Sequence, residues 1–242
     1  MEKRSIVAVV AGALGLLGIF DVILGPVLIH LGWVAPMFGF QWLFGLGLLE
    51  GLLALLLGLL ALWRTRQASG RSGRPLAWIG VGAGSALVAL LFVAARPGAG
   101  LPSINDITTD PADPPTFVSA LQAAPNQGRD MSYPPEFAEL QQAAYPDLAP
   151  IRASGSPAEV TDRARSTAES LGWEIVDVKP ETGHLEARQT SAVFQFVDEV
   201  VIRVRPHTGG SLVDVRSKSR DGRGDLGANA ARIRAFSEAL PR

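Results

Sequence analysis

Three long apolar segments dominate the first 96 residues of the chain. They run from Ser5 to about Leu31, from about Phe38 to Trp63 and from Ala77 to about Ala95. A bilayer core of about 30 Å requires roughly 18 or more mostly apolar residues in a helix, so each segment predicts a transmembrane helix. The first begins after basic residues, as a signal peptide does. Its apolar run is longer than a signal peptide's and has no small-residue cleavage site, so we expect it to be retained.

The basic residues predict the orientation of these helices. The linker between the second and third helices is strongly basic and contains Arg64, Arg66, Arg71 and Arg74. The turn from Leu31 to Met37 has no Lys or Arg. Because basic loops stay in the cytoplasm, we expect the N-terminus inside and everything after Arg96 outside. Arginine is far more frequent than lysine, which is typical of a bacterial gene of high GC content, and in a bacterium the outer side is the periplasm.

Two acidic residues, Asp21 and Glu50, lie inside the apolar segments. Counting about 1.5 Å per residue from the predicted ends puts both about 15 Å deep, so the two can face each other. Glycines at a spacing of four allow helix backbones to approach closely around the acid; they are Gly47, Gly51, Gly80 and Gly84. We expect protonated acids that hydrogen-bond the helices together, with proton or ion handling and contact with a lipid or partner as alternatives.

Proline dominates residues 97–150, which contain ten of the 17 prolines. Proline removes a donor from a strand ladder and fixes φ, so we expect an extended linker rather than a regular sheet. Within it, Phe137, Leu140 and Ala144 lie at helical spacing. They predict a short helix between Pro134 and Tyr145.

Residues 151–242 have the pattern of a folded domain. Ser156, Pro157 and Glu159 form a capping box with proline at the first helical position, and the helix they begin ends at Gly172. Short turns separate four alternating runs, which predict antiparallel strands at Trp173–Val178, His184–Thr190, Phe194–Arg205 and Ser211–Ser219. A last helix, capped by Asp225, extends to about Leu240.

Alternation along these strands predicts one buried and one solvated face of the sheet. The apolar positions of the third strand are Phe194, Phe196, Val200, Ile202 and Val204, with Asp198 on the same face. The opposite face has charged residues, namely Glu199, Arg203 and Arg205 from the third strand and Asp214, Arg216 and Lys218 from the fourth. The predicted fold class is α+β, with three transmembrane helices followed by a domain in which two helices pack on an antiparallel sheet of about four strands.

The most distinctive stretch is RSKSRDGRGDLGANAARIRAF at residues 216–236. It resembles the C-terminal signature of bacterial and plastid proteins grouped as domain of unknown function 1499, and the likeness covers roughly residues 105–242. The matching positions are Arg216, Ser217, Ser219, Arg220, Gly222, Asp225, Gly227, Asn229, Arg232 and Ile233. The acidic pair Asp198 and Glu199 after Phe196 resembles the family's acidic spot on the preceding strand. The resemblance implies a small α+β domain, often attached to membranes, without established catalytic residues.

The motif gathers guanidinium groups and backbone amides at a strand end, a turn and a helix start. Such a place can hold a phosphate or carboxylate, and the candidate ligand-binding residues are Arg216, Arg220, Asn229 and Asp198. In a structural interpretation the arginines instead pair with Asp198, Glu199 or Asp214, and the cap and turn are formed by Asp225, Gly227 and Arg232. We expect structural clamping, with ligand recognition and catalysis as alternatives.

Composition and the absence of known motifs argue against several other functions. Residues 1–96 have seven basic and three acidic residues, whereas residues 97–242 have fifteen and twenty, which argues against nucleic-acid binding by the C-terminal half. The absence of cysteine excludes thiolate nucleophiles, iron–sulfur clusters and disulfides. No nucleophile elbow, phosphate loop or zinc-protease motif is present, and His30, His184 and His207 are too scattered for a metal cluster, so we expect no cofactor and no metal.

Three functions follow from these features. The leading interpretation is a non-enzymatic protein of the bacterial inner membrane that presents a periplasmic domain to a protein, lipid headgroup or cell-wall partner. The alternative is an enzyme acting on an anionic envelope substrate, in which Arg216 and Arg220 bind charge and Asp198 or Asp225 is the acid or base. In a third interpretation the membrane helices act through Asp21 and Glu50.

Overall fold

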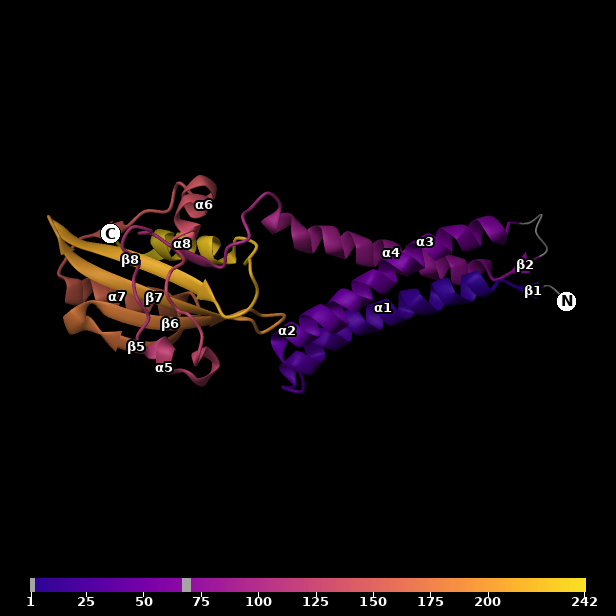
Figure 1. The fold of residues 1–242 in the computed structure, drawn as a ribbon, viewed down its shortest axis with the longest axis horizontal. Helices are drawn as coiled ribbons and strands as arrows, with labels where there is room; N and C mark the ends of the chain where they lie inside the picture. Colours follow the sequence, from indigo (N-terminus) through magenta and orange to yellow (C-terminus); the bar gives the residue numbers. More distant parts are fainter. Residues whose placement is uncertain (1–2, 67–70) are drawn as a thin grey trace. The chain divides into compact units, whose positions relative to one another are not determined.

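The computed structural model describes residues 3–66 and 71–242, and the chain forms two compact units (Figure 1). The first, here named the helical unit, comprises Met1–Pro97 together with Ala192–Gln195. The second, the sheet unit, comprises Gly98–Ser191 and Phe196–Arg242.

Three helices within the described residues are long and apolar enough to cross a membrane. The helical unit contains α1 (Ile6–His30), α2 (Pro36–Phe38), a π-helical turn (Gly39–Phe44), α3 (Gly45–Arg64) and α4 (Arg74–Ala95). The short α2 and the π-helical turn lead directly into α3, so that the second span is continuous from Pro36 to Arg64. The prediction of three long apolar helices is confirmed.

These helices pack closely because glycines occupy their contact positions. A Cβ atom added to Gly18 would lie 2.7 Å from the carbonyl oxygen of Gly47, and one added to Gly80 would lie 2.8 Å from the Cβ of Ala11. A Cβ on Gly84 would likewise collide with the backbone of α3. The predicted glycines therefore lie where helix backbones touch.

All three long helices meet at one end of the helical unit. Ala8, Ala61 and Ala77 form a buried cluster there. Next to this cluster, β1 (Lys3–Arg4) pairs in parallel with β2 (Arg71–Ser72). The start of α1, the end of α3 and the start of α4 thus lie together, which is the arrangement of three helices that run alternately up and down.

The sheet unit is built on a six-stranded antiparallel sheet with the order β3-β8-β7-β6-β5, and β4 also pairs with β8. Its strands are β3 (Asp106–Thr108), β4 (Ile151–Ala153), β5 (Glu174–Lys179), β6 (His184–Thr190), β7 (Val197–His207) and β8 (Gly210–Ser219). The last four are the predicted strands, whereas β3 and β4 are additional. Because β3 has three residues and no proline, it forms between the prolines of a segment in which no sheet was expected.

Helices α7 (Pro157–Ser170) and α8 (Ala228–Ala239) cover one face of the sheet (Figure 1). The predicted capping box begins α7, since the Ser156 hydroxyl accepts from the Glu159 amide and the Glu159 carboxylate accepts from the Ser156 amide. Trp173 stacks on Phe236 with ring centroids 5.3 Å apart. The core between helices and sheet includes Val160, Ala164, Leu185, Val200, Ile202, Val213, Val215 and Ile233.

The opposite face of the sheet is also covered, so the prediction of a solvated face was wrong. Phe117, Ala120 and Met131 pack there against Val201 of β7. The cover comes from the Pro-rich segment, which includes α5 (Ser119–Gln122). The charged residues beneath it are buried, namely Glu199, Asp214, Arg216 and Lys218. The alternation of residues within a strand could not predict a covering segment that lies far away in the sequence.

The predicted short helix is confirmed as α6 (Phe137–Ala144). Its Gln141 side chain is buried and completes the backbone bonding of β3. The Gln141 Oε1 atom accepts from the Thr108 amide at 2.9 Å, and Nε2 donates to the Thr108 carbonyl at 2.7 Å. One side chain thus acts as a neighbouring strand would.

Two of the differences from the predicted element boundaries affect residues of interest. β7 begins at Val197, so Phe194 and Phe196 precede the strand rather than belonging to it, because the backbone turns at Gln195 with φ of 52°. α8 begins at Ala228 with Gly227 as its N-cap residue, at φ of 85°. The predicted cap, Asp225, lies two residues earlier.

Candidate functional site

Arg216 of β8 and Asp106 of β3 form a fully buried ion pair, with 1% and 0% of their surfaces exposed. The Arg216 Nε atom donates to Asp106 Oδ1 at 2.9 Å, and Nη2 donates to Oδ2 at 2.7 Å. Nη1 also donates to the Pro115 carbonyl, and Nη2 to the Met131 carbonyl, at 3.0 and 2.8 Å. The guanidinium group is therefore bonded to the protein on each nitrogen, as a buried charge requires.

Aromatic rings and a second cation complete this cluster, which we name the arginine clamp: Asp106, Phe117, Tyr133, Arg216 and Lys218. The Arg216 Cζ atom lies 4.9 Å from the Phe117 ring centroid and 5.7 Å from that of Tyr133. Lys218 Nζ is 3.0 Å from Asp106 Oδ2. Burial and the negative charge of Asp106 raise the pKa of the Tyr133 hydroxyl, which therefore stays neutral.

Arg220, at the end of β8, pairs with Glu199 of β7. The Arg220 Nε atom lies 2.8 Å from Glu199 Oε1, which also accepts from Asn126 Nδ2 at 2.8 Å. Arg129 Nη1 donates to Asn126 Oδ1 at 2.9 Å. These bonds tie the Pro-rich segment to the centre of the sheet.

Arg232 of α8 links the acidic residue Asp198 to the end of β8. Its Nη2 atom donates to Asp198, and its Nη1 atom donates to Ser217 Oγ at 2.8 Å and to Asn229 Oδ1. Ser217 Oγ donates in turn to Asn229 Oδ1 at 2.7 Å. The network fastens α8 to β7 and β8.

Asp225 satisfies the amides at the start of α8. Its Oδ1 atom accepts from the Gly227 amide at 2.9 Å and its Oδ2 atom from the Asn229 amide at 2.8 Å. A helix start leaves such amides without partners inside the helix, and an anion could otherwise bind them. The carboxylate of Asp225 occupies that position.

Glu186 of β6 is a further buried carboxylate, and it lies outside the motif at residues 216–236. Its two oxygens accept from the amides of Val118, Ser119 and Ala120 at 2.6, 2.9 and 2.7 Å, and His184 Nε2 lies 2.8 Å from Oε1. Burial opposes ionisation, but the bonds from His184 and the three amides outweigh it and lower the pKa of Glu186. This carboxylate fixes the start of α5 on the sheet.

Asp214 of β8 is fully buried between two arginines of β7. Its Oδ2 atom is 3.0 Å from Arg203 Nη2 and 2.8 Å from Arg205 Nη2. Burial raises the pKa of Asp214 against the pull of both arginines. The same arginines pair with Asp110 and Asp113 of the Pro-rich segment, so the cations of this group are neutralised within the fold.

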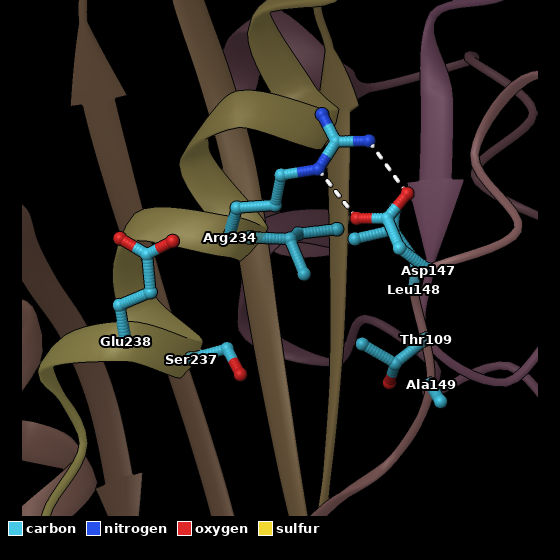
Figure 2. A pocket seen from close by; sticks show the side chains of 8 residues that line it. Thr109, Asp147, Leu148, Ala149, Arg234, Ser237 and Glu238 are labelled. Carbon is cyan, nitrogen blue, oxygen red and sulfur yellow. Dashed lines mark hydrogen bonds and ion pairs between the residues drawn. The ribbon is translucent and has the colours of Figure 1, made fainter.

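A shallow hollow of about 180 Å³ lies between α8 and the segment before β4 (Figure 2). Its lining residues are Thr109, Asp147, Leu148, Ala149, Ile233, Arg234, Ser237 and Glu238. Arg234 reaches across to Asp147 in Figure 2 with Nε–Oδ2 and Nη2–Oδ1 bonds of 2.6 and 2.8 Å, which lower the pKa of Asp147. Small-molecule sites usually have about 300–1,000 Å³, so this hollow is too small to enclose such a ligand.

Inside the helical unit, Glu50 is 8% exposed, and its Oε2 atom has no hydrogen-bond partner within the described residues. α1 passes beside it, because a Cβ on Gly18 would lie 3.3 Å from the Glu50 Cβ. Asp21 follows Gly18 by one turn on α1. The two acids thus belong to the contact between α1 and α3.

The structure distributes the four candidate ligand-binding residues over three separate networks. Arg216 pairs with Asp106 and Arg220 with Glu199, whereas Asp198 and Asn229 meet through Arg232. None of the four lines the hollow. Sequence reasoning missed Asp106, because 110 positions separate it from Arg216 and no local motif marks it.

Within the described ranges, no cluster of His, Cys, Asp and Glu side chains has the composition of a metal site.

Comparison with known proteins assigns the second half of the chain to a protein family. The model of a family described as protein of unknown function, DUF1499, matches residues 106–240, which is more than half of the chain. The chain belongs to the DUF1499 family. The matched region begins at Asp106 and contains all of the arginine clamp, whereas α1, α3 and α4 lie before it. No curated protein matches the chain.

Proposed function

We propose that this DUF1499 protein is an integral protein of the bacterial inner membrane that presents its sheet unit in the periplasm as a non-enzymatic binding module for an envelope partner. Support for the orientation comes from the basic residues at the joined end of the helical unit, including Arg4, Arg64 and Arg74. The turn at the other end of α1 has no basic residue between Leu31 and Met37. Basic residues favour the cytoplasmic side.

One observation supports a binding role above an enzymatic one: Arg216 and Asn229 of the charged motif are buried inside the fold. Arg216 and Asn229 are 1% and 0% exposed, and every polar group of the arginine clamp that we describe bonds to another part of the sheet unit. A catalytic acid, base or anion-binding group must reach its substrate. The enzyme alternative needs Arg216 to do so, and the fold holds it away from solvent.

We expect the partner to bind at the surface of α8 around Arg234. Arg234, Ser237 and Glu238 line the hollow on successive turns of the helix, opposite Asp147 (Figure 2). Its polar lining and small volume suit a single side chain or sugar group of a larger molecule, rather than an enclosed substrate. A binding module of this kind leaves its partner unchanged.

Crosslinking in intact membranes tests the proposal. The tagged full-length chain is crosslinked in cells, purified and analysed for bound proteins, lipids and cell-wall fragments. We expect a defined partner whose recovery falls at least tenfold in Arg234→Glu and is unchanged in Arg165→Glu, an exposed arginine of α7. Recovery of a chemically altered substrate, or a partner retained equally by both variants, would contradict a binding module at this surface.

A further inference from the structure

We infer that the joined end of the helical unit binds the phosphate groups of anionic phospholipids. The surface concerned, here named the basic end, consists of Arg4, Arg64, Arg66 and Arg74. This inference goes beyond the role of the sheet unit, because it concerns described residues of the helical unit. It depends on how the helices gather these arginines, on their depth and, for Arg4, Arg64 and Arg74, on the absence of an ion pair with any described carboxylate.

Backbone pairing holds the basic end together. Arg4 lies in β1, which pairs with β2 just before Arg74, and the Ser5 amide donates to the Ser72 carbonyl at 2.9 Å. The alanine cluster beneath joins the end of α3, where Arg64 and Arg66 follow. Segments from three parts of the chain thus place their arginines at one end of one bundle.

Tryptophans place this end at the level of the lipid headgroups. Trp63 and Trp78 are exposed beside the basic end, and Trp33 and Trp42 are exposed at the other end. Trp42 and Trp63 are 21 residues apart along one continuous span, or about 31 Å at 1.5 Å per residue. That length matches a hydrocarbon core of about 30 Å with a tryptophan at each interface. Arg64 therefore follows directly at headgroup depth.

The arginine side chains of the basic end are exposed, at the depth of the lipid headgroups. No described carboxylate forms an ion pair with Arg4, Arg64 or Arg74, and the segments 3–5, 64–66 and 71–74 contain no Asp or Glu. Arg66 lies over the Trp63 ring, 5.4 Å from its centroid, which keeps its guanidinium close to the interface. Guanidinium groups bind phosphate oxygens through two parallel hydrogen bonds. A lipid phosphate at the same depth supplies that partner.

The occupant is a lipid rather than a free phosphate, because the arginines lie beside exposed tryptophans and an apolar helix surface that lipid chains must cover. A headgroup with net negative charge is favoured over a zwitterionic one. Each basic residue near an anionic surface strengthens binding about fivefold, so three together contribute about 100-fold. Salt weakens this attraction.

The test uses the full chain in lipid nanodiscs, where orientation plays no part because both leaflets are accessible. Phosphatidylglycerol is titrated into phosphatidylcholine, and native mass spectrometry counts the lipids retained. We expect selective retention of phosphatidylglycerol, reduced about 100-fold in the triple variant Arg4→Gln, Arg64→Gln, Arg74→Gln. The matched control Arg96→Gln, at the other end of α4, should retain the parent's selectivity.

A second variant distinguishes loss of lipid binding from loss of folding in the triple glutamine variant. Substituting lysine at the same three positions keeps the charge but removes the paired geometry, and should lower selectivity several-fold while leaving helix content unchanged. Equal retention of both lipids by the parent, or equal loss in Arg96→Gln, contradicts the inference. Displacement of phosphatidylglycerol by excess inorganic phosphate assigns the site to a free anion. Retention of a copurified protein in place of lipid also contradicts the inference that the basic end binds lipid.

Discussion

Arg216 and Asp106 face each other diagonally across neighbouring strands. In the register of β3 and β8, Asp106 pairs with Lys218 and Arg216 pairs with Thr108. The long arginine side chain nevertheless spans the diagonal and bonds both oxygens of Asp106. One carboxylate thereby pairs with two cations of β8 and joins the strand of the sheet that comes first in the sequence to the one that comes last.

Arg216→Ala should destabilise the sheet unit strongly. Removing one partner of a buried ion pair costs about 3–5 kcal/mol, and we expect about 3 kcal/mol because Lys218 remains beside Asp106. Trp173 is the sole tryptophan of residues 98–242 and is buried, so fluorescence of that fragment during urea unfolding gives the measurement. Arg165→Ala, which breaks an exposed pair, should change the free energy of unfolding by less than about 0.5 kcal/mol. Equal midpoints for parent and Arg216→Ala would refute the clamp.

Asp225→Ala should weaken the start of α8. Loss of a helix cap costs about 1 kcal/mol, which lowers the melting temperature of a unit of this size by about 3 °C. Asp162→Ala on the exposed side of α7 is the control and should melt with the parent. A thermal melt that is unchanged in Asp225→Ala, together with loss of partner recovery, would instead assign Asp225 to a binding site.

Glu186 should make stability depend on pH. Its pKa in the folded state is lowered, so the ionised carboxylate stabilises the fold above the unfolded value of about 4.3. That contribution disappears as the pH falls through the folded pKa. Glu186→Gln should be less stable near neutral pH and should lose less stability on acidification, as measured by unfolding across this range. Glu136→Gln, an exposed control, should follow the parent curve, and an identical curve for Glu186→Gln would contradict the prediction.

Membrane orientation has a direct test. Alkaline phosphatase fused after residue 242 should be active, because the enzyme requires the periplasm, and the same enzyme fused after Arg71 should be inactive. The physical reason is the retention of basic segments in the cytoplasm. The reverse pattern of activities would overturn the proposed topology.

Glu50→Gln should insert and fold like the parent. A protonated carboxyl group resembles an amide in shape and hydrogen bonding, and the position is buried between helices. Glu50→Lys should impair assembly, because a cation at this depth has no described acceptor other than the acid on α1. Membrane abundance and resistance to protease provide the measurement. Loss of biological function at normal abundance in Glu50→Gln would support proton handling in place of a structural role.

Sequence reasoning succeeded where the determining interactions are local. The bounds of β6 were predicted correctly because alternation and two turns define it, and the capping box placed the start of α7. The three apolar helices follow from segment length and apolar composition.

The remaining features depend on contacts across long separations. β3 is three residues long among prolines, and its stabilising contacts come from the distant strand β8 and from Gln141 of α6. The second face of the sheet was predicted to be wet because the strands alternate, yet Phe117 and Met131 cover Val201. The motif residues were expected to be structural, but their partners Asp106 and Asn126 could not be named from the sequence. No periodic signal connects positions that are about 70 to 110 residues apart.

The pairing of β3 with β8 also determines when the sheet unit can form. β3 emerges from the ribosome among the first residues of the unit, whereas β8 and α8 are synthesised last. Until then Asp106 has no guanidinium partner, and the Pro-rich cover has no completed sheet to lie on. Contacts between such distant positions slow folding and leave apolar strands exposed in the meantime. Synthesis must therefore extend past β8 before the unit closes, and a chain truncated before residue 210 should remain a substrate for chaperones and proteases.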